Sequence, residues 1–361
     1  MPMAITDEQL LDSREAMAEI DPAGMAGLIE DLPRQWREAE EIARAAKIDG
    51  VGEPKNIVVL GMGGSAIGGD LVKSLLEPAA KTPIAVNRDY GLPAWVDENT
   101  LVVASSYSGN TEETLTAAAE AQRRGAKIVA LTTGGQLAQQ AEANGWPLIR
   151  IPAGLSPRAA IGYSFVPLYV LMERLGVTAS VAGDLAETAE VLERLKGRYG
   201  LDVPVAENPA KQLALALKGK LPLIYGAYGW SATAAYRWKT QINENSKAPA
   251  VSNEFPELNH NETVGWEVPA EVTQKIHVVI LRDRQDNERV KARIQVTREI
   301  IEGRAAGITE LWSEGQSAVA RLFSLIYPGD FVSLYLALVY RVDPTPVKMI
   351  DLLKSRLAEL S

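Results

Sequence analysis

Short apolar runs rich in β-branched residues alternate with helical segments along this chain, and this alternation constrains the fold more than any other feature. Alanine- and charge-rich segments such as EETLTAAAEAQRRG (112–125) separate several of the runs. This order predicts right-handed βαβ units, that is, a parallel sheet with helices on both faces. The runs with the length of a buried strand are NIVVL (56–60), PIAV (83–86), LVVAS (101–105), KIVAL (127–131) and PLIRI (147–151).

The second half of the chain repeats the first in the same order. Gly226 in LPLIYGAYG stands 165 residues after Gly61 in NIVVLGMGG. Four matches in one order indicate duplication of one α/β unit, and two unrelated α/β halves are the weaker alternative. The other matched pairs are AVNRDYGLP (85–93) with AVSNEFPEL (250–258), LVVASSYSG (101–109) with HVVILRDRQ (277–285), and FVPLYVLMERLGV (165–177) with FVSLYLALVYRVD (331–343).

These patterns divide the chain into four expected parts. Residues 1–50 form a helical segment, and residues 51–177 form a first α/β domain. Residues 178–218 form a helical connector, and residues 219–361 form a second α/β domain with a C-terminal helix. That last helix is predicted to begin at Thr345, with Pro346 in its first turn.

Charge and composition exclude several classes of protein. The chain has 37 Lys and Arg against 46 Asp and Glu, so it lacks the basic footprint that nucleic acid requires. It has no cysteine, which excludes disulfides and thiolate sites, and its two histidines, His260 and His277, argue against a multi-histidine metal centre. No uncharged apolar run spans a membrane, and the acidic N-terminal stretch is unlike a signal peptide, so a cytoplasmic protein without a membrane partner is expected.

A glycine-rich loop, GMGGSAIGGD (61–70), directly follows the first predicted strand. Glycines let the backbone turn tightly and approach a ligand, and the following helix N-terminus favours an anion. Gly61, Gly63 and Ala66 fit a dinucleotide-binding pattern, but VNRDY places Asn87 and Arg88 where an acidic ribose ligand belongs. Without a partner motif, a plain tight turn would be the simpler interpretation.

A second motif, SSYSGNTEET (105–114), supplies that partner. It follows LVVA and places Ser106, Ser108 and Thr111 at the start of a helix. Capping needs one hydroxyl, whereas a phosphate group with several acceptor oxygens would use all three beside backbone N–H donors. No P-loop lysine follows, so a phosphomonoester on a small molecule fits better than a nucleoside triphosphate.

The two motifs together resemble the sugar isomerase (SIS) family, whose double-domain members bind phosphosugars. More specifically, the chain from about residue 50 to 358 is similar to the bifunctional phosphoglucose/phosphomannose isomerases. The resemblance implies two tandem SIS domains, each a mainly parallel five-stranded sheet flanked by helices, behind a helical N-terminal extension. The motifs that carry it are GMGGSAIGGD, SSYSGNTEET, SPRAAIGY, INENSKAP, NEFPELNHNE and DPTPVKMIDLLKSRL.

The resemblance also assigns catalytic roles. Glu244 corresponds to the base that moves a proton between C1 and C2, and Arg158 corresponds to the cation beside the enediolate oxygen. His260 and Lys354 correspond to residues that assist ring opening. Rival candidates are Glu254, Glu257 and Glu262 for the base and Lys348 for the lysine, and His277 is expected to be a packed residue. The residues expected to hold the substrate phosphate are Gly64, Ser65, Ser106, Ser108 and Thr111.

The resemblance therefore implies interconversion of glucose 6-phosphate, and of mannose 6-phosphate, with fructose 6-phosphate through an enediol. It implies no metal or organic cofactor, a place in glycolysis and gluconeogenesis, and a homodimer in which the partner supplies His260 to a shared site. The loops GAYGWSAT (226–233) and RDRQDNE (282–288) lack the phosphate motifs, so only the first half is expected to bind phosphate. A phosphosugar sensor without activity is the alternative, and a nicotinamide dehydrogenase rests on the glycine loop alone.

Overall fold

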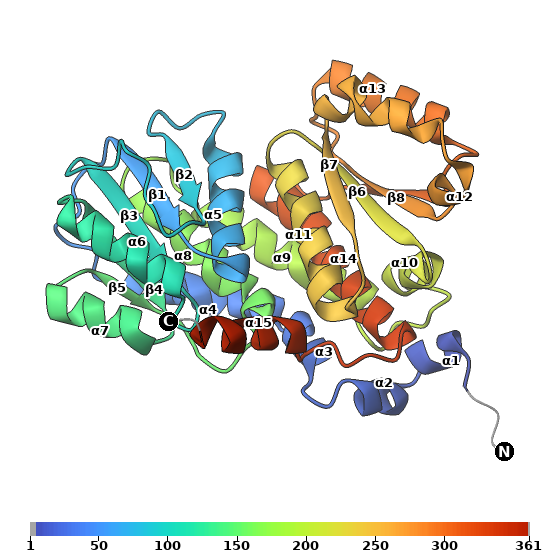
Figure 1. The fold of residues 1–361 in the computed structure, drawn as a ribbon, viewed down its shortest axis with the longest axis horizontal. Helices are drawn as coiled ribbons and strands as arrows, with labels where there is room; N and C mark the ends of the chain where they lie inside the picture. Colours follow the sequence, from blue (N-terminus) through green and yellow to red (C-terminus); the bar gives the residue numbers. More distant parts are fainter. Residues whose placement is uncertain (1–4, 360–361) are drawn as a thin grey trace.

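The computed structural model describes residues 5–359, in which two parallel β-sheets flank a shared layer of helices (Figure 1). The first sheet has five strands in the order β2-β1-β3-β4-β5, and every neighbouring pair is parallel. Its elements are β1 (Asn56–Leu60), α5 (Gly63–Leu76), β2 (Ile84–Asn87), β3 (Thr100–Ser105), α6 (Glu112–Arg123), β4 (Lys127–Thr132), α7 (Gly135–Asn144), β5 (Leu148–Arg150), the 3-10 turn η1 (Pro157–Ala159) and α8 (Ile161–Arg174).

Alternating side chains of β1 explain why helices cover both faces of this sheet. Ile57 and Val59 point into the core that contains α5 and α8, whereas Val58 and Leu60 pack with residues of α6 and α7. All four side chains are almost fully buried. A strand that is apolar on both faces needs helices on both sides, as the sequence predicts.

The second sheet has the order β7-β6-β8-β9 and is also parallel throughout. This order and that of β2-β1-β3-β4 are the same once each strand is matched to its counterpart at the repeat interval, as duplication predicts. Its elements are β6 (Leu221–Ala227), α11 (Trp230–Ser246), β7 (Val251–Phe255), η2 (Glu257–His260), η3 (Glu262–Trp266), α12 (Ala270–Thr273), β8 (Ile276–Arg282), α13 (Glu288–Ile301), β9 (Gly307–Trp312) and α14 (Ala318–Val339).

The described part of the second sheet has four strands, not the expected five. Residues 313–317 lead directly from β9 to α14. In the first half, α7 and β5 occupy the corresponding stretch between β4 and η1. Five residues cannot hold a helix and a strand, so the duplicated unit is shortened here.

The N-terminal segment and the connector are helical, as expected. Helices α4 and α9 pack against each other, α4 packs on α8, and α9 and α10 pack on α14. These helices are α1 (Asp7–Leu11), α2 (Arg14–Ile20), α3 (Met25–Glu30), α4 (Leu32–Ala45), α9 (Ala182–Tyr199) and α10 (Pro209–Leu217).

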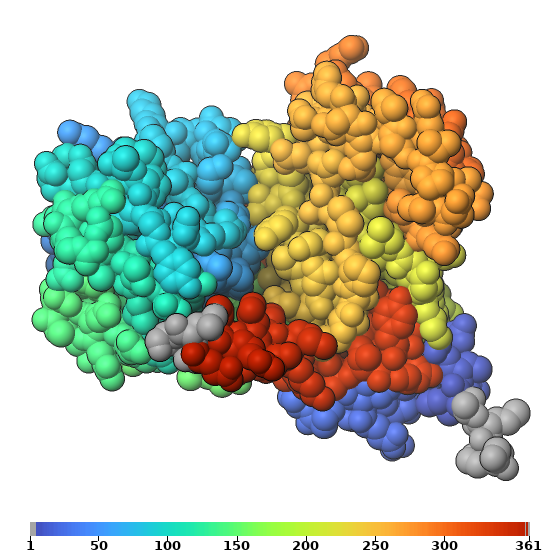
Figure 2. Space-filling view, viewed as in Figure 1, coloured from blue at the N-terminus to red at the C-terminus, as the bar shows by residue number. Residues whose placement is uncertain are grey.

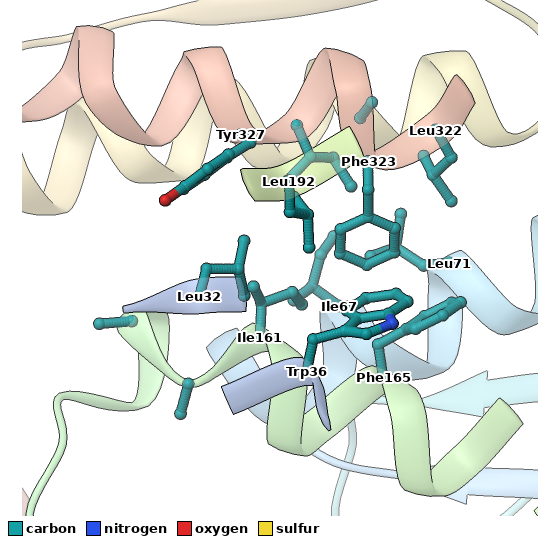
Figure 3. Packing of buried hydrophobic residues seen from close by; sticks show 14 of the residues in the cluster. Leu32, Trp36, Ile67, Leu71, Ile161, Phe165, Leu192, Leu322, Phe323 and Tyr327 are labelled. Atoms are coloured by element: carbon teal, nitrogen blue, oxygen red, sulfur yellow. The ribbon is translucent and has the colours of Figure 1, made fainter. Parts of the chain in front are cut away.

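One continuous core joins the two halves (Figure 3). Trp36 of α4 stacks on Phe165 of α8 with ring centroids 5.6 Å apart, and the edge of Phe323 of α14 meets both rings. The Trp36 indole N–H donates to the carbonyl of Leu185 at 3.0 Å. Each such buried aromatic contributes about 1.5–3 kcal/mol, so this cluster holds the halves in a fixed relation.

Helix α14 is the one helix among residues 5–359 that is long and apolar enough to cross a membrane by length and composition. Its apolar window is entirely buried within the protein, where it contacts α9, α10 and α11. The last helix, α15 (Lys348–Ala358), differs in lying on the surface (Figure 2). It begins at Lys348, not at Thr345, because the carbonyls of Pro344 and Thr345 bond to side chains of the first half and of α11.

Candidate active site

The two motif loops lie side by side at one edge of the first sheet. Gly61 follows β1 and Ser106 follows β3, and these strands are parallel neighbours. The chain leaves β1 toward β2 on one side and leaves β3 toward β4 on the other. In open parallel sheets, ligands bind in the crevice at this reversal of strand order.

Hydroxyl groups from both loops converge at this edge. Ser106 Oγ lies 2.8 Å from Thr111 Oγ1 and also accepts the N–H of Gly109. Ser65 Oγ accepts the N–H of Tyr107 at 3.0 Å, which ties the glycine loop to the serine loop. Ser65 and Ser106 are buried, whereas Ser108 is exposed and accepts the N–H of Asn110.

Two helix N-termini open at the same place without side-chain caps. Helix α5 starts after Met62 and α6 after Thr111, and neither N-cap side chain bonds to the helix backbone. Amide groups in the first turn of each helix therefore have no partner from a cap, which favours an anion. Together with the hydroxyls they form a set of donors suited to a phosphate.

Arg158 lies in η1 beside this edge and is 4% exposed. Its Nε donates to Asn245 Oδ1 at 2.5 Å, and its Nη2 donates to the carbonyls of Pro344 and Thr345 at 2.6 and 2.8 Å. Burial lowers the pKa of Arg158 from its ordinary value, while the charges of Glu244 and Asp343 oppose that shift. The guanidinium remains charged, because arginine is far too basic to lose its proton near neutral pH.

Glu244 reaches the same place from the second half. It occupies the last turn of α11, and its Oε2 lies 3.5 Å from Arg158 Nη1. Its side chain is 29% exposed, so one part faces the buried cation and another part remains accessible. The expected base and the expected cation, 86 residues apart in sequence, are therefore neighbours.

A cavity of about 720 Å³ adjoins Glu244. The end of α11 forms one wall, and the segment from Val342 to Ile350 forms the other. Lys247 and Lys348 line this cavity, whereas Lys354 lies farther along α15 and is exposed. Of the two rival lysines, Lys348 is thus the one that shares a cavity with Glu244 in this structure.

His260 lies away from the Glu244 of its own chain. It ends η2, which follows the carboxyl end of β7, and β7 is paired with β6 so that both strands end together. Helix α11 starts just after that edge at Trp230, and Glu244 in its last turn stands 14 residues, about 21 Å, farther along the helix. A single chain therefore does not assemble His260 with Glu244 and Arg158.

His277 is a packed residue, as expected. It is 7% exposed on β8, and its Nε2 lies 2.9 Å from Thr309 Oγ1 on β9. Burial lowers the pKa of His277, which favours the neutral ring.

The corresponding edge of the second sheet is filled by its own ion pairs. Arg282 pairs with Glu310 and stacks on Trp312, and Asp283 accepts from Arg321 and Ser313. Acidic side chains here replace the hydroxyls of the first half. The negative charge of these side chains disfavours a phosphate. The loops of the second half, residues 226–233 and 282–288, also lack the phosphate motifs in sequence.

Four groups that touch Arg158 or Glu244 were not among the residues predicted from the sequence. They are the amide of Asn245, the ammonium group of Lys247, and the carbonyls of Pro344 and Thr345. Asn245 and Lys247 stand in the motif INENSKAP, but no local pattern shows that the segment near residue 344 returns to this motif. The signal is a long-range contact that only the folded chain displays.

Known protein families match both halves of the chain. A model of the SIS domain matches residues 52–151, and a model of the bacterial phospho-glucose isomerase C-terminal SIS domain matches residues 206–357. A bifunctional phosphoglucose/phosphomannose isomerase from Caldicellulosiruptor bescii is 50% identical over 331 residues, covering 91% of this chain and 98% of that protein. A protein of the same name from Aquifex aeolicus is 38% identical, and the match covers 84% of this chain and 90% of that protein.

Among solved structures, a hypothetical protein from Thermus thermophilus matches with a TM-score of 0.72. The match covers 97% of this chain and 95% of that protein at 19% identity. At that identity the likeness shows the fold alone, and the curated relatives carry the argument for function.

Proposed function

This chain belongs to the family of bifunctional phosphoglucose/phosphomannose isomerases, and we propose how its own residues perform the reaction. It is an isomerase of sugar phosphates, acting between an aldose 6-phosphate and fructose 6-phosphate. The resemblance stated from the sequence and the identity to the C. bescii and A. aeolicus proteins agree on this activity.

The phosphate of the substrate binds at the edge of the first sheet. Ser65, Ser106, Ser108 and Thr111 supply hydroxyls, and the first turns of α5 and α6 supply amide donors. A phosphate dianion makes several charge-assisted hydrogen bonds there, which fix the sugar by its tail. Gly64 contributes a first-turn amide of α5 without a side chain to block it.

The carbon atoms that react lie beside Glu244 and Arg158. The Glu244 carboxylate takes the proton from C2 of the aldose, which leaves an enediolate, and returns it to C1 while the proton of the O2 hydroxyl passes to O1. The reverse steps convert the ketose to the aldose. Arg158 Nη1 faces Glu244 and donates to the enediolate oxygen. Both glucose and mannose 6-phosphates yield the same enediolate, since they differ only at C2.

The single observation that carries this proposal is the 3.5 Å contact between Arg158 of the first half and Glu244 of the second, beside the hydroxyl loops. A sensor needs the hydroxyl loops but has no use for a carboxylate held against a buried cation. The pair and the family relatives therefore both favour the enzyme over the sensor.

We further infer that the enzyme is a cytoplasmic homodimer that needs no metal. The separation of His260 from Glu244 within one chain supports a shared site, in which the partner's loop supplies the ring-opening histidine. An imidazole ring has one nitrogen that can donate and one that can accept, which ring opening requires.

The test is to incubate the protein with fructose 6-phosphate and EDTA, without a nicotinamide cofactor, and to quantify glucose and mannose 6-phosphates. We expect both products, and we expect Glu244→Gln to lower kcat about 10²- to 10⁴-fold by removing the base. Binding of fructose 6-phosphate without product would support the sensor instead. A requirement for a nicotinamide cofactor would support the dehydrogenase.

A further inference from the structure

We propose that Asn245 is a positioning residue that orients the Arg158 guanidinium toward the substrate. This inference rests on the function proposed above for Arg158, and it concerns a residue to which the sequence analysis gave no role. Asn245 is fully buried on α11, next to Glu244, and it touches Arg158 but not the cavity that Glu244 lines.

The donors of Arg158 are nearly all committed. A guanidinium has one N–H on Nε and two on each Nη. Nε donates to Asn245 Oδ1, and Nη2 donates to the carbonyls of Pro344 and Thr345. Nη1 alone remains on the side of Glu244, so these bonds decide which edge of the guanidinium faces the reacting carbons.

Asn245 is itself held in one orientation. Arginine Nε can only donate, so the atom of Asn245 that faces it must be the carbonyl oxygen. The Asn245 amide group then donates to Ser333 Oγ at 3.0 Å, and Ser333 Oγ donates to the carbonyl of Asp330 at 2.8 Å. Both Asn245 and Ser333 are fully buried, so this chain of bonds has no competition from solvent.

The main chain of Arg158 is fixed by the same helices. Arg237 of α11 donates to the carbonyl of Arg158 at 3.1 Å and to the carboxylate of Asp330 at 2.7 Å. Gln241 also donates to Asp330, so α11 and α14 form a buried polar framework behind Arg158. The backbone and the side chain of Arg158 are therefore held by different bonds of one framework, and Asn245 is the framework residue that bonds to the side chain.

The decisive test compares Asn245→Leu with Asn245→Asp in the full-length enzyme. Leucine has a similar volume but no acceptor, so the guanidinium loses its Nε anchor and can rotate. We expect kcat to fall about 10- to 100-fold with KM changed less than about threefold, because misplacement by about 1 Å has effects of this size. Aspartate keeps an acceptor oxygen for Nε, so we expect it to restore kcat to within about threefold of wild type.

Two controls separate positioning from stability. Asn208→Leu removes another fully buried asparagine, one that caps α10 far from Arg158, and it should lower the melting temperature without changing kcat. Ser333→Ala removes the anchor of Asn245 but leaves its oxygen, and a kcat lowered about threefold is expected. If Asn245→Leu does not fold, a wild-type kcat in Ser333→Ala overturns the proposal.

Equal kcat values in Asn245→Leu and Asn245→Asp, or a wild-type kcat in Asn245→Leu well below its melting temperature, would also overturn it. Arg158→Ala in the same assay separates the role proposed for Arg158 from the positioning role proposed for Asn245. If Arg158→Ala keeps wild-type kcat, the role proposed for Arg158 fails and this proposal fails with it. If Arg158→Ala loses activity while Asn245→Leu keeps it, only the positioning role fails.

Discussion

Gly64 packs so closely on Pro157 that a Cβ at position 64 would stand 2.7 Å from the Pro157 carbonyl oxygen. Gly64 lies in the first turn of α5, and Pro157 opens the turn η1 that carries Arg158. Real Cβ atoms essentially never lie this near a backbone oxygen, so the glycine sets how closely η1 approaches the hydroxyl loops. The glycine motif therefore also places Arg158, the cation proposed to face the enediolate.

Gly64→Ala is expected to push η1 away and to displace Arg158 from Glu244. We expect a loss of about 1–3 kcal/mol in the free energy of unfolding from overpacking. We also expect kcat to fall about 10- to 100-fold, since a shift of about 1 Å at the reacting groups has that cost. Denaturant unfolding and steady-state kinetics measure the two effects.

Gly183→Ala is the matched control for this substitution. Gly183 lies in the first turn of α9, and a Cβ there would meet no atom within 4 Å. We expect this variant to keep wild-type kcat and to be equally or slightly more stable, because alanine favours a helix. A Gly64→Ala enzyme as active as Gly183→Ala would contradict the steric argument.

Ser106→Ala tests the phosphate site. Loss of the hydroxyl removes a donor for the substrate and an acceptor for the Gly109 N–H. We expect KM for fructose 6-phosphate and Ki for inorganic phosphate to rise together by about tenfold, which corresponds to about 1.4 kcal/mol. Stability should fall by about 1 kcal/mol through the loss of the internal hydrogen bond.

Ser317→Ala provides the comparison for Ser106→Ala. Ser317 also starts a helix, α14, and its Oγ accepts the N–H of Ala320, but it belongs to the second half. Its loss should cost about 1 kcal/mol of stability and leave KM and Ki unchanged. If both serine variants bind phosphate as the wild type does, the hydroxyl loop is not the phosphate site.

The sequence predicted the arrangement of the fold because the repeat is local and regular. The run NIVVL and its counterpart LPLIYGA became β1 and β6, each an interior strand of its sheet. Two features were missed where long-range contacts override local pattern. The second sheet lacks a fifth strand among the described residues, and α15 begins at Lys348 because Arg158 and Lys247 bind the carbonyl of Pro344.

The site was predictable only in part, for the same reason. Ser106 and Thr111 could be identified from their spacing after a strand, because loop and helix start are adjacent in sequence. Glu244 and Arg158 came from family resemblance, since no spacing rule connects residues 86 positions apart. Asn245 could not be singled out, because its contacts with Arg158 and Ser333 depend on the packing of α11 between η1 and α14.

Lys247 is expected to be unusually reactive. It adopts a left-handed backbone conformation at the end of α11 (φ 55°), and its Nζ donates to the carbonyls of Glu244 and Pro344. Although the residue as a whole is exposed, burial of its ammonium group and the charge of Arg158 lower the pKa of Lys247 to about 8. About half of the Lys247 side chains are then neutral at pH 8, whereas below about 1% of ordinary lysine side chains are neutral at that pH.

Labelling with an amine reagent at pH 7 to 9, followed by peptide mapping, measures this. We expect Lys247 to be labelled at least about tenfold faster than Lys239 of the same helix, with a midpoint near pH 8. Because the pKa of Lys247 is lower in the folded protein, the unfolded chain binds more protons between pH 8 and 10. The contribution of Lys247 to the free energy of unfolding should therefore rise with pH over this range. Equal labelling of the two lysines would refute the lowered pKa.

A mixed dimer provides the sharpest test of the shared site. Glu244→Gln and His260→Ala chains are each expected to form inactive homodimers, since every site lacks one of the two groups. In a heterodimer with shared sites, the His260→Ala chain supplies Glu244 and the Glu244→Gln chain supplies His260. One of the two sites is then complete, so we expect about half of the wild-type kcat per dimer.

The heterodimer is obtained by co-expressing the two chains with different affinity tags and purifying through both. The activity of the heterodimer distinguishes a site shared between two chains from a site built within one chain. In the second arrangement each chain lacks one of the two groups, so no site in the heterodimer is complete. An inactive heterodimer beside an active wild-type dimer carrying the same two tags would reject the shared site. It would also require His260 to reach Glu244 of its own chain, which stands about 21 Å along α11 from the sheet edge that η2 follows.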